Sequence, residues 1–336
     1  MKARALIVGV AVLLLAACGS STKQSEPAKH TITRHKQVPK LPDPKRVGAN
    51  ELGVIPVIML HRVLKNPASE YDTTPSQFRN ELRTLFRRGF RPISAADMVT
   101  GRIDVPAGKT PVVLTFDDSS PEQFSLLPDG KVDPETAVGI MLAFARKHPG
   151  FTPTATFYVI ASLFGGGSNG PDLLAELARL GFDIGDHTYD HSNLGSLDAT
   201  GVQKEIVLGE RLINDAVPEE KVRTMALPYG VYPVPHDLAI RGSWDGQSYH
   251  YQGVMEVGSG PAPSPFSIDF DPLGIPRIRS GPWKGQVDYG SGYWLHYFKL
   301  NPDRLFVSDG DPNRISFPSI FAGAVAPQYR ARANPY

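Results

Sequence analysis

The stretch VVLTFDDSS, residues 112–120, joins a short apolar run to two adjacent carboxylates. Val112 to Phe116 are β-branched, apolar or aromatic with a single threonine, and polar turn residues follow, a pattern typical of a buried strand whose C-terminal end reaches a loop. Asp117 and Asp118 would repel each other there and lose hydration. We therefore expect a compensating positive charge beside them.

Strand and helix signals alternate on both sides of this stretch. Strands are predicted over residues 54–60, 111–117, 154–160, 182–186, 223–227 and 251–258, and helices over 75–88, 133–147, 171–180 and 201–215. Such alternation predicts a parallel sheet covered by helices, either a barrel or a doubly wound sheet. In both folds the site lies at the carboxyl ends of the strands, where Asp117, Asp118, His61, DHTYDH and LPYG all fall.

The segment GDHTYDHSNL, residues 185–194, carries two histidines four positions apart. A helical turn would place His187 and His191 on one face. Three protein ligands and an open position make a catalytic metal site, and one of the two strand-end aspartates can supply the third ligand. The sequence thus predicts a divalent cation that compensates the two carboxylates.

The motifs TFDD, HTYDH and LPYG, in this order, resemble those of the polysaccharide deacetylases of carbohydrate esterase family four. The strand PVIMLHRV is also similar to the first strand of this family, and the resemblance covers residues 53 to 280. It implies a distorted, incomplete (β/α) barrel. It also implies metal-assisted hydrolysis of acetyl groups from a sugar, usually the N-acetyl of a glucosamine residue.

The resemblance further implies a role for each matching residue. Asp117 would be the general base, and Asp118, His187 and His191 would hold the metal ion, with zinc as the ion expected first. The backbone N–H of Tyr229, which follows Pro228 in the third motif, would stabilise the oxyanion. His61 would either line the pocket or serve as a structural histidine.

The sequence departs from the family pattern at two positions. Ala226 stands where the family usually has an arginine that orients the base, and the late Leu-x-His motif that supplies an acid has no clean match. His296 in YWLH is the nearest candidate for the acid, although this aromatic segment could simply be packing.

A later arginine could replace the missing one. In FDPLGIPRIRS, residues 270–280, Arg277 and Arg279 share one face if the segment is a strand. An arginine fork can hold a carboxylate through two hydrogen bonds. The setting Ile-Pro-Arg-Ile resembles a late strand of deacetylases that also lack the early arginine, so we expect Arg277 to reach Asp117, the alternative being a surface salt bridge.

The first 18 residues predict an export signal. Lys2 and Arg4 precede 13 apolar residues and the sequence LAAC, which looks like a lipobox with Cys18, the chain's only cysteine, as the lipidated residue. Residues 19–52 are rich in Lys and Pro and predict a flexible linker. We expect the catalytic domain over residues 53–321 and a C-terminal tail over 322–336.

Three interpretations of function follow. The first is a lipid-anchored, metal-dependent deacetylase of an envelope or extracellular polysaccharide, on the outer face of the cell membrane. The others are a catalytically degenerate glycan-binding domain and a metallohydrolase of the same fold that acts on a non-glycan amide or ester. A net charge of +1 argues against nucleic acid as a partner, and we expect a monomer. The aromatic residues Trp244, Tyr249, Tyr251 and Trp283 could form sugar-stacking platforms, although most aromatic residues in a chain of this size are core.

Overall fold

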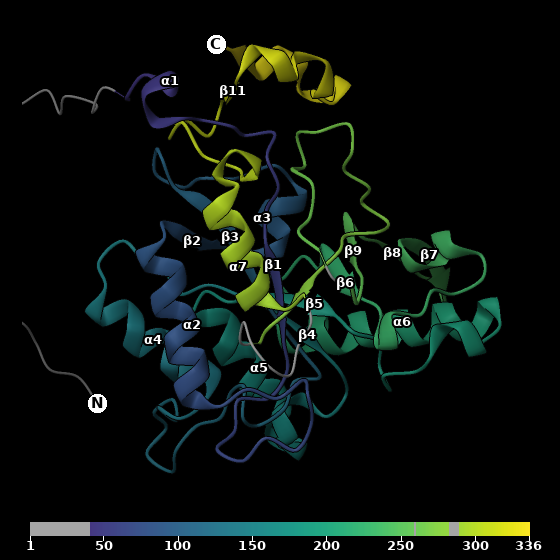
Figure 1. The fold of residues 1–336 in the computed structure, drawn as a ribbon. Helices are drawn as coiled ribbons and strands as arrows, with labels where there is room; N and C mark the ends of the chain where they lie inside the picture. The colour runs from purple at the N-terminus through teal and green to yellow at the C-terminus, as the bar shows by residue number, and fades with distance from the viewer. Residues whose placement is uncertain (1–40, 259, 282–288) are drawn as a thin grey trace, which may run out of the picture. The chain divides into compact units, whose positions relative to one another are not determined.

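Eight parallel strands form the central sheet, in the order β10-β1-β3-β4-β5-β6-β9, with β2 paired to β3 (Figure 1). The strands of this sheet are β1 Val57–Leu60, β2 Phe90–Ile93, β3 Thr110–Asp117, β4 Thr156–Val159, β5 Asp183–Asp186, β6 Thr224–Ala226, β9 Gly253–Met255 and β10 Ile278–Arg279. The short strands outside it are β7 Arg241–Trp244 with β8 Gln247–His250, and β11 Ile315–Phe317 with β12 Ala333–Pro335.

The α-helices are α1 Pro44–Val47, α2 Pro75–Arg87, α3 Ala95–Val99, α4 Ala137–Lys147, α5 Gly170–Arg179, α6 Ala199–Ala216 and α7 Ser291–Leu300. This computed structural model describes residues 41–258, 260–281 and 289–336. Cys18, most of the expected linker and Trp283 therefore lie outside the described residues.

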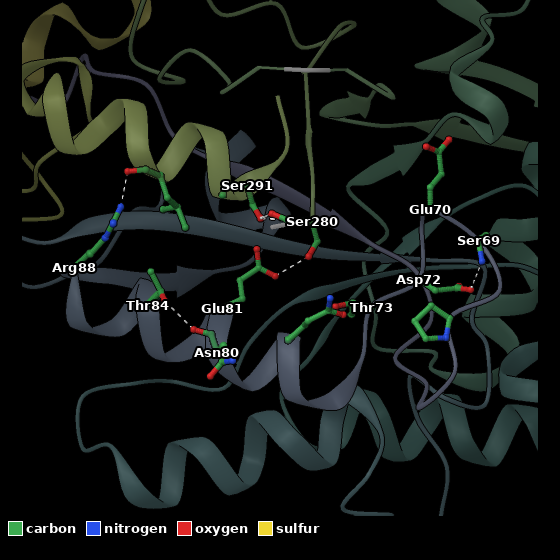
Figure 2. A pocket seen from close by; sticks show the side chains of 15 residues that line it. Ser69, Glu70, Asp72, Thr73, Asn80, Glu81, Thr84, Arg88, Ser280 and Ser291 are labelled. Atoms are coloured by element: carbon green, nitrogen blue, oxygen red, sulfur yellow. Dashed lines mark hydrogen bonds between the residues drawn. The ribbon is translucent and has the colours of Figure 1, made fainter. Parts of the chain in front are cut away.

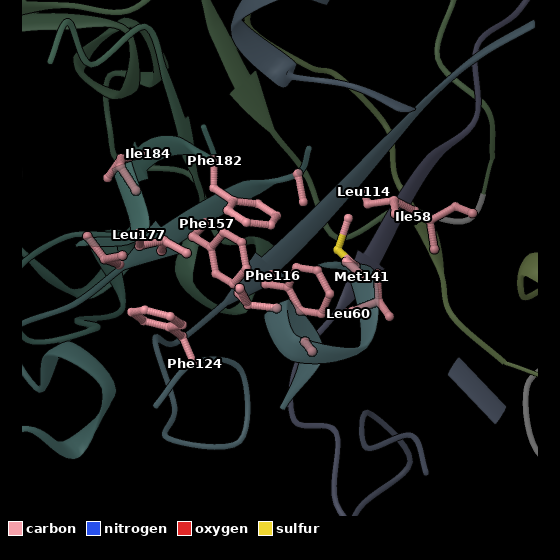
Figure 3. Close-up of a cluster of buried hydrophobic side chains, with 14 of the residues drawn as sticks. Ile58, Leu60, Leu114, Phe116, Phe124, Met141, Phe157, Leu177, Phe182 and Ile184 are labelled. Carbon is pink, nitrogen blue, oxygen red and sulfur yellow. The ribbon is translucent and has the colours of Figure 1, made fainter. Parts of the chain in front are cut away.

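Both faces of the sheet are buried, which suits a parallel sheet. Along β3, Val112, Leu114 and Phe116 point to the face covered by α2, α4, α5 and α6, where Phe116 stacks on Phe157 (Figure 3). The alternate residues Val113, Thr115 and Asp117 point to the other, inner face. The period of two therefore places the Asp117 carboxylate inside the curled sheet.

The sheet curls into an incomplete (β/α) barrel, and one segment spans the seam between its ends. Ile275 forms a parallel bridge to Met255 of β9, and Ile278 pairs with Ile58 of β1. Arg277 lies between these two contacts and is fully buried. Its position in the seam directs its side chain to the inner face, toward the end of β3.

The predicted strands and helices are present, with shifted ends. Thr74 caps α2 in a capping box with Gln77, as the sequence predicts. The predicted start of α4 at Asp133 was wrong. Thr136 caps the helix instead, because its side chain accepts a hydrogen bond from the Gly139 N–H.

The expected domain limits need correction at both ends. The compact unit begins at Leu41 and runs to Tyr336. The C-terminal residues are not a tail, because β12 pairs with β11 and the Tyr336 hydroxyl donates to the Ala49 carbonyl at 2.7 Å. Backbone pairing and burial of Phe317 and Val325 hold this region to the inner core.

Candidate active site

The site lies at the carboxyl ends of β1, β3, β5 and β6, around a cavity of about 370 Å³. Its lining includes His61, Asp117, Asp118, His187, His191 and Tyr229. These residues come from separate segments of the chain, and parallel pairing brings the strand ends to one edge of the sheet. The convergence expected from the sequence is therefore present in the structure.

Asp118, His187 and His191 form a compact set of potential metal ligands. Their ligand atoms lie within 4.8 Å of one another. Asp118 Oδ1 is 3.5 Å from His187 Nε2 and 3.4 Å from His191 Nε2. This oxygen is buried and has no hydrogen-bond partner among the described residues, so the set fits a cation that would fill that role.

The orientation of His187 depends on a backbone contact. His187 Nδ1 lies 2.8 Å from the carbonyl oxygen of Ala226, which leaves Nε2 to face Asp118. A second partner of this kind sets the tautomer of a metal-binding histidine. Because the carbonyl makes the contact, it does not depend on the Ala226 side chain.

Several non-glycine residues at the site have left-handed backbone conformations. The φ angles are 76° for Asp118, 54° for His191 and 58° for Tyr229. Such conformations cost of order 1–3 kcal/mol each and persist where the surrounding structure enforces them. At Asp118 the next residue supplies that support, because Ser119 Oγ accepts a hydrogen bond from the Ile160 N–H and its carbonyl accepts one from the Phe164 N–H.

Asp117 is compensated by an arginine and not by the cation site alone. Arg277 donates from two nitrogens to the two oxygens of Asp117, at 2.7 Å each. Its Nη1 also lies 3.2 Å from Thr115 Oγ1, and its Nε donates to the Glu256 carbonyl. Burial raises the pKa of Asp117, but the charges of Arg277 and His187 outweigh burial and hold that pKa well below its usual range.

His61 lines the cavity, as one of the two interpretations of the sequence proposed. Its Nδ1 is buried without a partner among the described residues, and its ring lies 5.0 Å from that of Tyr71. Burial lowers the pKa of His61. This ring is therefore neutral at neutral pH.

The third motif places Tyr229 at the rim. Pro228 is buried, whereas Tyr229 is 65% exposed and its ring lies 4.6 Å from that of His191. The structure thus brings the expected oxyanion residue beside a potential metal ligand, and its role stays a prediction.

The candidate acid His296 is not brought to the cavity by the described residues. It lies on α7, whose neighbouring residues Leu295 and Phe298 pack into the core, and this packing turns His296 to the exposed side of the helix. It is not part of the described lining of the cavity. Tyr249 and Tyr251 are also buried and are not stacking platforms.

Gln123 is a supporting residue that the sequence did not reveal. Its buried side-chain amide donates to the carbonyls of His61, at 3.1 Å, and of Asp117. It therefore ties the ends of β1 and β3 together under the cavity. The only signal was its place shortly after TFDD.

Comparison with known proteins shows which proteins this chain is similar to. Residues 104–241 match the polysaccharide deacetylase family model. The chain is 29% identical over 126 residues to a chitooligosaccharide deacetylase of a Bradyrhizobium species, covering 38% of this chain and 49% of that one. It is 24% identical over 144 residues to a peptidoglycan-N-acetylglucosamine deacetylase of Bacillus cereus, covering 43% and 46%. The chain thus spans about half the length of the curated relatives it matches.

Solved structures confirm the fold of polysaccharide deacetylase type. A Streptococcus pyogenes deacetylase in complex with acetate superposes with a TM-score of 0.51 at 20% identity, covering 68% of this chain and 93% of that one. A polysaccharide deacetylase from Bacillus cereus gives 0.50 at 17% identity, covering 67% and 64%. The family model and the relatives are thus similar to part of this chain, and the solved structures share its fold.

Proposed function

We propose that this protein removes acetyl groups, in particular the N-acetyl group of a hexosamine, from a polysaccharide with the help of a divalent metal ion. The observation that carries the proposal is the position of Asp117, held by Arg277, directly beside the set Asp118, His187 and His191. A base next to a three-ligand site is the arrangement required for metal-assisted hydrolysis of an amide.

Asp118, His187 and His191 would hold the ion, with zinc expected first. When bound, such an ion supplies Lewis acidity and lowers the pKa of bound water. Asp117 would accept the proton of the attacking water, and Arg277 would fix the orientation of its carboxylate. The backbone N–H of Tyr229 would donate to the developing oxyanion.

The arrangement supports catalysis over glycan binding alone. A binding domain has little use for a buried, oriented carboxylate beside an open ligand set, and Arg277 supplies the contact that Ala226 cannot.

The proposed location is the outer face of the cell membrane, through a lipid on Cys18. The sequence LAAC after an apolar run supports this proposal. Within residues 41–336, apart from the undescribed positions, no helix is long and apolar enough to cross a membrane.

Acetate release tests the activity. The purified chain is incubated with acetylated chito-oligosaccharides, peptidoglycan and acetyl-xylan, with and without a chelator. Chelator-sensitive release from an N-acetylated glycan is expected. Release from acetyl-xylan alone would shift the proposal to O-acetyl esters, and no release from any of the three by metal-loaded protein would contradict it.

A further inference from the structure

A second cavity of about 390 Å³ adjoins the proposed metal pocket. Polar side chains of α2 form one wall, and Ser280, Gly281 and the start of α7 form the other (Figure 2). Ser69 and Asp72 line both cavities, so the loop between β1 and α2 separates them. A chain-like ligand bound at the metal pocket would therefore have to pass over this loop to reach the second cavity.

The wall between the cavities is braced by matched charges. Asp72 accepts two hydrogen bonds from Arg62, at 2.8 Å each, and further ones from the backbone N–H groups of Ala68 and Ser69. Glu70 pairs with Arg279 at 3.1 Å, whose guanidinium lies 5.0 Å from the ring of Tyr71. The negative charges of Asp72 and Glu70 are therefore already compensated by arginines of the protein.

Glu81, in the middle of the cavity, differs from them. Its Oε2 accepts a hydrogen bond from Ser280 at 2.7 Å, whereas its buried Oε1 has no partner among the described residues. Asp118 Oδ1 in the metal pocket is an orphaned oxygen of the same kind. A buried acceptor without a partner costs free energy, so it marks a place where a ligand donor fits.

We propose that this second cavity binds a hexosamine unit with a free amine, next along the glycan, and that Glu81 recognises its ammonium group. The proposal rests on the proposed function, because removal of an acetyl group creates such an amine. Burial raises the pKa of Glu81, and an ammonium brings both a hydrogen-bond donor for Oε1 and the opposite charge that would keep the carboxyl ionised. An acetamido group is neutral and brings no such charge.

The rest of the lining suits a sugar. Gln77 and Asn80 offer amide groups and Thr84 a hydroxyl, each able to pair with sugar hydroxyls. Arg88 lines the end opposite Asp72, and donates to the Leu295 carbonyl (Figure 2). The protein would thus prefer glycans that have already lost some acetyl groups.

Calorimetric titration tests this preference without relying on turnover. The protein is titrated with a glucosamine tetramer and with an N-acetylglucosamine tetramer. Wild type is expected to bind the glucosamine tetramer about tenfold more tightly, and Glu81→Gln to bind both alike. Glu176→Gln, on α5 and outside both cavities, is the matched control and should keep the preference.

A second variant guards against a folding defect in the first. Ser280→Ala removes the donor that orients Glu81 and should reduce the preference to about threefold. Equal binding of both tetramers by wild type, or an unchanged preference in folded Glu81→Gln, would overturn the inference. Acetate release from acetylated chito-oligosaccharides is scored separately, so that a failure of the proposed function is distinguished from a failure of this subsite.

Discussion

Both oxygens of the Asp117 carboxylate accept a hydrogen bond from Arg277, at 2.7 Å each, across 160 residues of sequence. The pair is buried, and Arg277 reaches it from the seam between β9 and β1. The contact expected from the sequence is therefore present. Its effect on turnover remains to be measured.

Arg277→Lys should keep the fold and bound metal but lower kcat by about a hundredfold. A lysine ammonium keeps the charge but cannot donate from two fixed nitrogens to both carboxylate oxygens. Acetate release and metal content measure the two effects. Arg102→Lys, at an exposed ion pair with Asp97 outside both cavities, should stay close to wild type, and near-wild-type turnover in Arg277→Lys would contradict the positioning role.

Removal of the buried charge should also affect stability. Arg277→Met leaves Asp117 uncompensated and should lower the free energy of unfolding by about 3–5 kcal/mol. The double variant Asp117→Asn, Arg277→Met removes both charges and should recover part of this loss. Denaturant unfolding measures both values; a double variant no more stable than the single one would show that the loss comes from packing.

The two adjacent aspartates should separate metal binding from proton transfer. Asp118→Ala, His187→Ala and His191→Ala should each lose stoichiometric metal and activity together. Asp117→Asn should keep the metal and lose about 10²–10⁴-fold in rate, because a general base is removed while the ligands stay. Metal analysis beside kinetics decides the assignment, which would be reversed if Asp117→Asn lost the metal and Asp118→Asn kept it.

Asp183, at the start of β5, should make stability depend on pH. Burial raises its pKa from 3.8 to about 7, although Thr156 and the Ala96 N–H donate to one of its oxygens. The folded state then holds the proton more tightly than the unfolded state, so its contribution to stability is complete below about pH 4 and is lost as the pH rises through about 7.

The slope from this one group approaches about 1.4 kcal/mol per pH unit. Asp183→Asn keeps the accepting oxygen and should remove that slope. Unfolding free energies measured at pH 5, 6 and 7, with each pH held to within about 0.2 units, test the difference. Parallel curves for the variant and wild type would rule out this residue as the source.

Cys18 should determine where the protein resides. Wild type is expected in the membrane fraction with an acylated N-terminus at Cys18, and Cys18→Ser should not be acylated. Fractionation and mass spectrometry of the mature N-terminus measure both. A mature N-terminus at another residue, without a lipid, would contradict the anchor.

The sequence alone determined which local segments form and which residue types gather at the strand ends. Alternating strands and helices predicted the parallel sheet, and TFDD with HTYDH predicted the ligand set, because these signals depend on neighbours a few residues apart. It could not decide that residues 322–336 belong to the folded unit or that His296 lies outside the described lining of the cavity, since both depend on packing against distant segments.

Tertiary structure decided which group compensates each of the two carboxylates. The sequence predicted a single cation that would compensate both Asp117 and Asp118. The contact of Arg277 with Asp117 was a separate expectation, which depended on a resemblance to the family. In the fold, Asp117 is matched by Arg277, and Asp118 is left with an orphaned oxygen beside two histidines. The physical reason is that curling of the sheet brings the seam segment against the inner face of β3, and neither charge pairing nor an unpartnered oxygen is visible until distant segments are in contact.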